Sequence, residues 1–197
     1  DAGAALEAHI AALFDEVEGM VPEGQLVQLF RLKYDYHNAK ALIKAQAMGT
    51  DCGAILSQRG TVPPQKLHAA FYEEDYRDIP PVLAQAMVDA AAILARTANP
   101  QAADFALDRA YFAQMLALCD GLSDGGFAKG YVQLQIDGAN LRAAVRTRRM
   151  AKDVDFLKNA LVSGGTIGTD RVLAAFESAE ALTALYANTW LSNAAAA

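Results

Sequence analysis

Two pairs of polar residues could carry chemistry in this chain. Asp35 and Asn38 stand three residues apart in the segment LKYDYHNAKALIK, and Asp137 and Asn140 stand three apart in LQIDGANLRAAVR. Residues three apart lie on the same face of a helix, so each pair presents a carboxylate and an amide side by side. Such groups can bind a metal ion or take part in catalysis, and they can also accept hydrogen bonds from backbone amides.

Two interpretations of these pairs are open. In the first, each pair is a structural bracket, whose oxygens accept hydrogen bonds from unpaired amides at the start of a neighbouring helix or from a nearby Arg or Lys. A buried polar group without a partner costs about 1–3 kcal/mol, so some partner must be present. In the second, the pairs serve catalysis or metal binding. The bracket is favoured, because acid–base catalysis would need a second carboxyl on the same face and neither copy supplies one.

The two pairs belong to a duplicated pattern, Asp-x-x-Asn-x-(Lys/Arg), in which the copies are 102 residues apart. Lys40 and Lys44 of the first copy correspond to Arg142 and Arg146 of the second. Repeats of this kind indicate duplicated supersecondary units. The sequence therefore predicts two helical repeat units, residues 1–98 and 99–197, each with one block.

A second repeated signal follows each block. GTVPPQKLHAAF begins at Gly60, and GTIGTDRVLAAF begins 105 residues later at Gly165. Glycine permits a positive φ and threonine offers a hydroxyl to nearby backbone, so the Gly-Thr-(Val/Ile) step predicts a tight turn between helices. A phosphate-binding loop would need further glycines and a Lys-Ser/Thr pair, which are missing.

The elements that position these blocks have a helical apolar period throughout. No convincing alternating strand is present, so the predicted fold class is all-α, built from repeated helical units. The first expected helix carries its apolar residues on one face, namely Leu6, Ile10, Leu13 and Val17. Further helices are expected over about 25–48, 53–58, 63–76, 82–96, 99–118, 127–150, 153–162 and 169–186.

Composition narrows the function classes. The 197 residues carry a net charge of −6, which gives no general basic field for nucleic acid. The two cysteines form no disulfide framework or metal motif, and a reducing compartment is expected. No secretory signal and no apolar stretch long enough to span a membrane are visible.

Other candidate sites are weaker. His9, His37 and His68 have no metal-ligand spacing. The acidic run at 72–78 is interpreted as a solvated helix end, because no second acidic motif answers it. The sequence therefore predicts neither a catalytic residue, nor a cofactor, nor a metal.

A basic face follows the second block. Arg142, Arg146 and Arg149 fall three or four residues apart and hence on one side of a helix. Cations near a helix C-terminus complement the helix dipole, which is one explanation. The other is that these residues form a docking interface for an acidic partner.

Four segments together resemble the C subunit of rotary V/A-type ATPases, whose family includes the eukaryotic d subunit (AC39). These are LKYDYHNAKALIKAQAMG, ALDRAYFAQML, YVQLQIDGANLRAAVRTRRM and LVSGGTI, in the order and spacing of the family. The resemblance extends from about residue 6 to about residue 190. Members of that family have three such units, so the resemblance implies a partial chain that lacks N-terminal helices and the third block.

The resemblance also implies a function. The family's helical units form a funnel-shaped, non-catalytic rotor part at the cytoplasmic face of the membrane. It links the central stalk to the membrane rotor ring and transmits torque for proton or sodium transport. The expected partners are thus central-stalk subunits and the rotor ring, with no nucleic acid and no direct membrane span.

Two alternative functions stay open from the residues alone. One is an all-α metal-dependent enzyme, which divalent-ion stabilisation would reveal. The other is a generic helical-repeat scaffold, although the repeat of 102–105 residues is longer than common solenoid periods.

Overall fold

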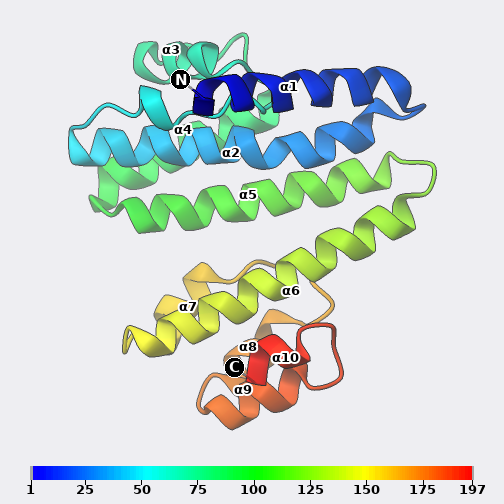
Figure 1. Cartoon of the computed structure of the whole chain (residues 1–197). Coiled ribbons are helices and arrows are strands. Elements are labelled where there is room, and N and C mark those ends of the chain that lie inside the picture. Colours follow the sequence, from blue (N-terminus) through cyan, green and yellow to red (C-terminus); the bar gives the residue numbers. More distant parts are fainter. Residues whose placement is uncertain (1, 197) are drawn as a thin grey trace. The chain divides into compact units, whose positions relative to one another are not determined.

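The computed structural model describes residues 2–196, and every element in that range is a helix (Figure 1). The predicted all-α fold class is thereby confirmed. The search for membrane-crossing helices among the described residues finds none with the required length and apolarity. The elements are α1 (Ala2–Met20), α2 (Gly24–Met48), the short 3-10 helix η1 (Gly53–Ile55), α3 (Pro64–Glu73), α4 (Pro81–Thr97), α5 (Pro100–Asp120), α6 (Gly125–Arg149), α7 (Val154–Ala160), α8 (Thr169–Ala175), α9 (Ala179–Tyr186) and α10 (Ser192–Ala196).

The helix boundaries follow from local chemistry. Pro64, Pro81 and Pro100 occupy the first turns of α3, α4 and α5, where no amide donor is needed. The Asn99 side chain caps α5 by accepting a hydrogen bond from the amide of Gln101 at 3.0 Å. These prolines and the Asn99 cap therefore mark where the helices begin.

The chain divides into two compact units, one up to Ser123 and one from Asp124 onward. Their limits differ from the repeat units predicted at 1–98 and 99–197. The physical reason is α5, which packs closely on α2 and α4 of the first unit although it follows residue 98. The repeat units describe the duplication in the sequence, whereas the compact units describe where side chains pack.

The core of the first unit lies between α2, α4 and α5. Large side chains that are fully buried there include Leu29 and Tyr36 of α2, Met87 of α4 and Leu107 of α5. Phe112 and Met115 add further buried surface from α5. Burying side chains of this size contributes about 1.5–3 kcal/mol each, so α5 is an integral part of this unit.

The second unit has its own core, in which the buried residues of α6 meet those of the short helices that follow. The predicted helix over 169–186 is interrupted there. Helix α8 ends before Phe176, and Ser178 caps α9 by accepting a hydrogen bond from the amide of Ala181 at 2.9 Å. A local cap therefore overrides the continuous apolar period. The buried cluster comprises Leu141, Ala144, Leu157, Leu161, Ile167, Val172, Ala175, Leu182 and Tyr186.

The apolar residues Leu6, Leu13 and Val17 of α1 are largely exposed, since each is more than 40% accessible. Two further expectations differ from the structure. The expected helix at 53–58 contracts to η1. Helix α3 ends at Glu73 instead of about Tyr76, because Glu74 adopts a left-handed conformation with φ 55° and closes the last turn.

Candidate functional site

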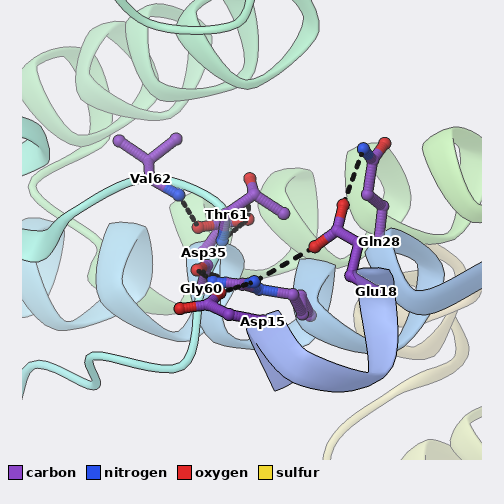
Figure 2. Close-up of polar contacts among 8 residues, drawn as sticks. Asp15, Glu18, Gln28, Asp35, Gly60, Thr61 and Val62 are labelled. Carbon is purple, nitrogen blue, oxygen red and sulfur yellow. Dashed lines mark hydrogen bonds and ion pairs between the residues drawn. The ribbon is translucent and has the colours of Figure 1, made fainter. Parts of the chain in front are cut away.

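The first polar pair holds a loop against α2. Asp35 is completely buried and accepts three hydrogen bonds from the loop that precedes α3 (Figure 2). The amide and hydroxyl of Thr61 donate to its Oδ2 at 3.1 and 2.7 Å, and the amide of Val62 donates to its Oδ1 at 3.0 Å. The carboxylate therefore satisfies the buried amide of Val62 and the partly buried donors of Thr61.

Asn38 holds the same loop one turn further along α2. Its Oδ1 accepts from the amide of Ser57 at 2.7 Å, and its Nδ2 donates to the carbonyl of Ser57 at 2.9 Å. An amide side chain thus pairs with both backbone groups of one residue, because it carries a donor and an acceptor side by side. We call Asp35, Asn38 and the loop they bind the first bracket.

The second polar pair repeats this arrangement on α6. Asp137 accepts hydrogen bonds from the amide of Thr166 at 3.2 Å, from its hydroxyl, and from the amide of Ile167 at 3.1 Å. Asn140 accepts from the amide of Val162 at 2.9 Å and donates to its carbonyl at 2.8 Å. This second bracket matches the first bond for bond.

The glycine of each Gly-Thr step is required by close approach. A Cβ on Gly60 would lie well inside the 3.0 Å that real Cβ atoms keep from other heavy atoms, against the Asp35 carboxylate, and a Cβ on Gly165 would lie equally close to the Asp137 carboxylate. Neither glycine has a positive φ. The reason for glycine offered from the sequence was therefore wrong, and the step is a close contact instead of a left-handed turn.

An arginine that has no counterpart in the second bracket extends the first one. Arg31 donates to the carbonyl of Gly60 through Nη2 at 2.7 Å and Nε at 3.2 Å. Its Nη1 also contacts Asp15 at 2.6 Å and Glu18 at 3.2 Å, and both belong to α1. Gln28 of α2 completes the network by donating to Glu18 at 3.2 Å, as Figure 2 shows. Arg31 therefore ties α1 to the bracket loop.

The electrostatics of the brackets reflect burial. Desolvation raises the pKa of Asp35, and the hydrogen bonds from Thr61 and Val62, with the charge of Arg31, act in the opposite direction. Desolvation and the charge of Asp137 raise the pKa of Tyr186 to about 12, and its hydroxyl lies 3.4 Å from the backbone carbonyl of Asp137. Both Asp35 and Tyr186 therefore have neighbouring protein groups as hydrogen-bond partners.

The structure places all four predicted bracket residues at buried positions and gives each protein partners. The partners differ in kind from those expected. The carboxylates of Asp35 and Asp137 accept from a loop just before the next helix, not from unpaired amides of a helix start. Among the described residues, no Arg or Lys side chain hydrogen-bonds either carboxylate directly. This loop can lie against the helix because the glycine of its Gly-Thr step leaves room for the Asp carboxylate.

Sequence reasoning treated the two repeated signals as separate features. The structure joins them, since the Thr of each Gly-Thr step donates to the Asp of the preceding block. Ser57 and Val162, which pair with Asn38 and Asn140, were not predicted from the sequence. A usable signal existed, because Ser57 and Val162 are 105 residues apart, as are Gly60 and Gly165.

The basic residues divide into two groups in the structure. Arg142, Arg146 and Arg149 are exposed, and none of them hydrogen-bonds or forms an ion pair within the described second unit. Arg148 instead donates to the carbonyl of Phe176 at 2.5 Å and lies over its ring. The place of the three exposed arginines in the last turns of α6 agrees with both explanations offered from the sequence, the helix dipole and a partner interface.

Metal chemistry was the alternative for the polar pairs. Over the part of the chain that the structure describes, no group of three or more His, Cys, Asp or Glu side chains is arranged to hold a metal ion. The oxygens of Asp35 and Asp137 are already engaged by loop donors. The bracket arrangement can fix the position of a loop on a helix, because its side chains join the helix to that loop through hydrogen bonds.

The fold and the paired brackets define a class of protein, an all-helical protein in which a duplicated polar block clamps the loop that follows its helix. The family comparison gives this class a name. The model of the ATP synthase (C/AC39) subunit family matches residues 1–196. The chain therefore belongs to the ATP synthase (C/AC39) subunit family, and the resemblance stated from the sequence is confirmed.

Individual relatives agree with the family. The chain is 29% identical over 140 residues to the C subunit of the V-type ATP synthase of Thermus thermophilus. The matched region covers 68% of this chain and 43% of that relative. It is 21% identical over 173 residues to the C subunit of the V-type sodium ATPase of Enterococcus hirae, covering 88% of this chain and 52% of the relative. The chain thus spans about half the length of these curated relatives. A comparison with solved structures gives no match.

Proposed function

We propose that this chain acts as a non-catalytic rotor part of a V/A-type ATPase or ATP synthase. In this proposal it links the central stalk to the membrane rotor ring at the cytoplasmic face and transmits torque for proton or sodium transport. The observation that carries the proposal is the family match along the chain, together with relatives that are named as C subunits of V-type complexes.

The brackets support a mechanical role. A part that transmits torque must resist rearrangement between its helices and loops. Each bracket joins a long helix to the following loop through five hydrogen bonds that lie at least partly out of water, where hydrogen bonds are electrostatically stronger. We propose that Asp35, Asn38, Asp137 and Asn140 serve to keep this register fixed under load.

The basic face of α6 is the proposed contact with a partner. Arg142, Arg146 and Arg149 are exposed and lie on one side of the helix. Exposed like charges one turn apart repel each other, and an acidic partner surface would relieve that repulsion. The proposal assigns this face to contact with the central stalk.

A pull-down tests the proposal. Immobilised central-stalk subunits, and separately the detergent-solubilised rotor ring, are challenged with the chain, with an Arg146→Glu/Arg149→Glu variant, and with an Arg96→Glu control of an exposed basic residue elsewhere. Retention of the wild-type chain that falls only with the α6 reversals supports the role and its interface. Absence of retention on both baits, with a full-length protein that is folded, would refute the rotor assignment.

A further inference from the structure

Helix α1 is joined to the loop of the first bracket, residues 56–63, through the side chain of Arg31. The Nε and Nη2 atoms of Arg31 donate to the carbonyl of Gly60 at 3.2 and 2.7 Å. Its Nη1 atom donates to the carboxylates of Asp15 at 2.6 Å and Glu18 at 3.2 Å, and both acids belong to α1 (Figure 2). The guanidinium therefore lies between α1 and the loop and hydrogen-bonds to each.

The ring of Phe14 provides a second connection from α1 to the same loop. The guanidinium carbon of Arg31 lies 5.9 Å from the centroid of this ring, and the ring of Tyr34 packs on it edge-on at 6.1 Å. The hydroxyl of Tyr34 accepts a hydrogen bond at 3.5 Å from Nη1 of Arg59, the residue just before Gly60. Both connections from α1 therefore end at adjacent residues of the loop.

These connections meet the loop where it lies nearest to α2. A Cβ on Gly60 would collide with the Asp35 carboxylate, so the backbone has no spare space at this point. The next two residues, Thr61 and Val62, donate their hydrogen bonds to that carboxylate. Because hydrogen bonds weaken steeply as they lose alignment, a shift of the Gly60 peptide weakens the bracket.

The second bracket provides an internal comparison. Its carboxylate, Asp137, accepts the matching hydrogen bonds from Thr166 and Ile167. The position of Arg31 is taken there by Gln133, 102 residues later. Glutamine is uncharged and forms no ion pair with a carboxylate. The two brackets therefore share their hydrogen bonds and differ in the arginine.

We propose that docking of α1 and closure of the first bracket loop are coupled through Arg31, so that release of either element loosens the other. When α1 is docked, its acids hold the guanidinium against the carbonyl of Gly60. When α1 leaves, water reaches the guanidinium and competes with that carbonyl for its N–H groups. The coupling acts in both directions, because linkage between two equilibria is reciprocal. The inference goes beyond the proposed function and does not depend on it.

The exposure of the two acids makes this coupling sensitive to salt. The side chains of Asp15 and Glu18 are 69% and 30% exposed, whereas that of Arg31 is 12% exposed. Salt screens charges that face water, so it should weaken the contact between α1 and Arg31. Because partly exposed ion pairs contribute little free energy, we expect changes of a few-fold in the opening of α1 and the loop.

Amide hydrogen exchange of the full chain measures both elements in one experiment. The Asp15→Asn/Glu18→Gln variant removes the charges that face Arg31 and preserves the shapes of the side chains. We expect exchange to become at least about threefold faster in α1 and also at the amides of Thr61 and Val62. Glu16→Gln, which neutralises an exposed acid of α1 outside this contact, should change neither element by more than about 1.5-fold.

Salt provides the same test without a substitution. Raising the salt concentration of the wild type from about 0.05 M to about 0.5 M should speed exchange in α1 and at Thr61 and Val62 together. The amides of Thr166 and Ile167 in the second bracket serve as the internal reference for these rates. The response should be smaller in the Asp15→Asn/Glu18→Gln variant, because the ion pairs that salt screens are already gone.

The reverse direction is tested from the loop. Thr61→Val removes the hydroxyl that donates to Asp35, and it should speed exchange in α1 by at least about twofold. Thr166→Val removes the corresponding hydroxyl of the second bracket. It should speed exchange at Ile167 and leave α1 unchanged, because no arginine joins that loop to α1.

Three results would overturn the inference. They are faster exchange in α1 of the Asp15→Asn/Glu18→Gln variant with no change at Thr61 and Val62, a salt response confined to α1, and a Thr61→Val variant whose α1 exchanges like that of the wild type. Failure of the chain to bind the central stalk and the rotor ring would refute the proposed function and leave these exchange rates as they are. The two failures are therefore distinguishable.

Discussion

Replacing Gly165 with alanine should disrupt the second bracket although the residue itself makes no side-chain contact. The added methyl would occupy the space of the Asp137 carboxylate, so the loop and the helix must separate. Separation breaks the hydrogen bonds that Thr166 and Ile167 donate to that carboxylate. Hydrogen bonds to a charged group contribute about 1.5–3 kcal/mol each, and loss of two of the three lowers the free energy of unfolding by about 3–6 kcal/mol.

A double-mutant cycle separates this mechanism from a general intolerance of the loop to alanine. Asp137→Ala alone should cost about 3 kcal/mol, because it leaves the buried amide of Ile167 and the partly buried donors of Thr166 without their acceptor. In that background Gly165→Ala should cost less than about 1 kcal/mol, since the atom it would strike is gone. The coupling energy between the two sites is then about 2–5 kcal/mol.

Urea unfolding followed by far-UV circular dichroism measures these free energies. Hydrogen exchange at the amides of Thr166 and Ile167 reports the bracket directly, even in a variant too unstable for a full titration. Gly130→Ala is the matched control, because a Cβ at this position in α6 meets no atom within 4 Å. It should stabilise the helix by about 0.5–1 kcal/mol. Equal costs of Gly165→Ala with and without the Asp137 carboxylate would refute the reasoning.

Three further perturbations test other parts of the structure. Asn38→Ala removes the two hydrogen bonds that Asn38 makes with the backbone of Ser57 and should cost about 1–3 kcal/mol in urea unfolding, with faster exchange of the Ser57 amide. Arg31→Ala should speed hydrogen exchange throughout α1 several-fold, whereas Arg96→Ala, which removes an exposed arginine of α4, should not. Tyr186 has a pKa raised from 10.0 to about 12, so the unfolded chain loses its proton first. Between about pH 10 and pH 12 the wild type should therefore lose about 2–3 kcal/mol relative to Tyr186→Phe, and an unchanged difference would show that the hydroxyl is not desolvated.

The brackets illustrate how far the sequence could lead. The placement of Asp35 and Asn38 within an apolar helix indicated burial, and burial required partners, because the alternative is costly. The identity of those partners depended on which loop comes back to the helix. Nothing in the residues around Asp35 indicates that Thr61 and Ser57 donate to this helix, since these contacts span 26 and 19 residues of chain.

For the basic residues, the sequence pattern does not show which of them are paired. Lys40 and Arg142 occupy the same position in the repeated block, so the block does not distinguish them. Only the structure shows that Lys40 is paired with Asp108 on a helix that follows it, whereas Arg142 is exposed. The difference arises from the neighbouring element and is invisible in the block itself.

The helical fold, the duplication and the positions of the four bracket residues could be predicted from the residues alone, because periodicity, proline and spacing are properties of neighbouring residues. The family was indicated by the resemblance of four segments and is shown by the family model that matches residues 1–196. Tertiary structure decided why Gly60 and Gly165 are glycines, where the two compact units divide, and which bases have acidic partners. Each of these depends on atoms from distant segments that meet only when the chain folds. Close approach, packing and charge pairing act through space, and one sequence read along its length does not record those distances.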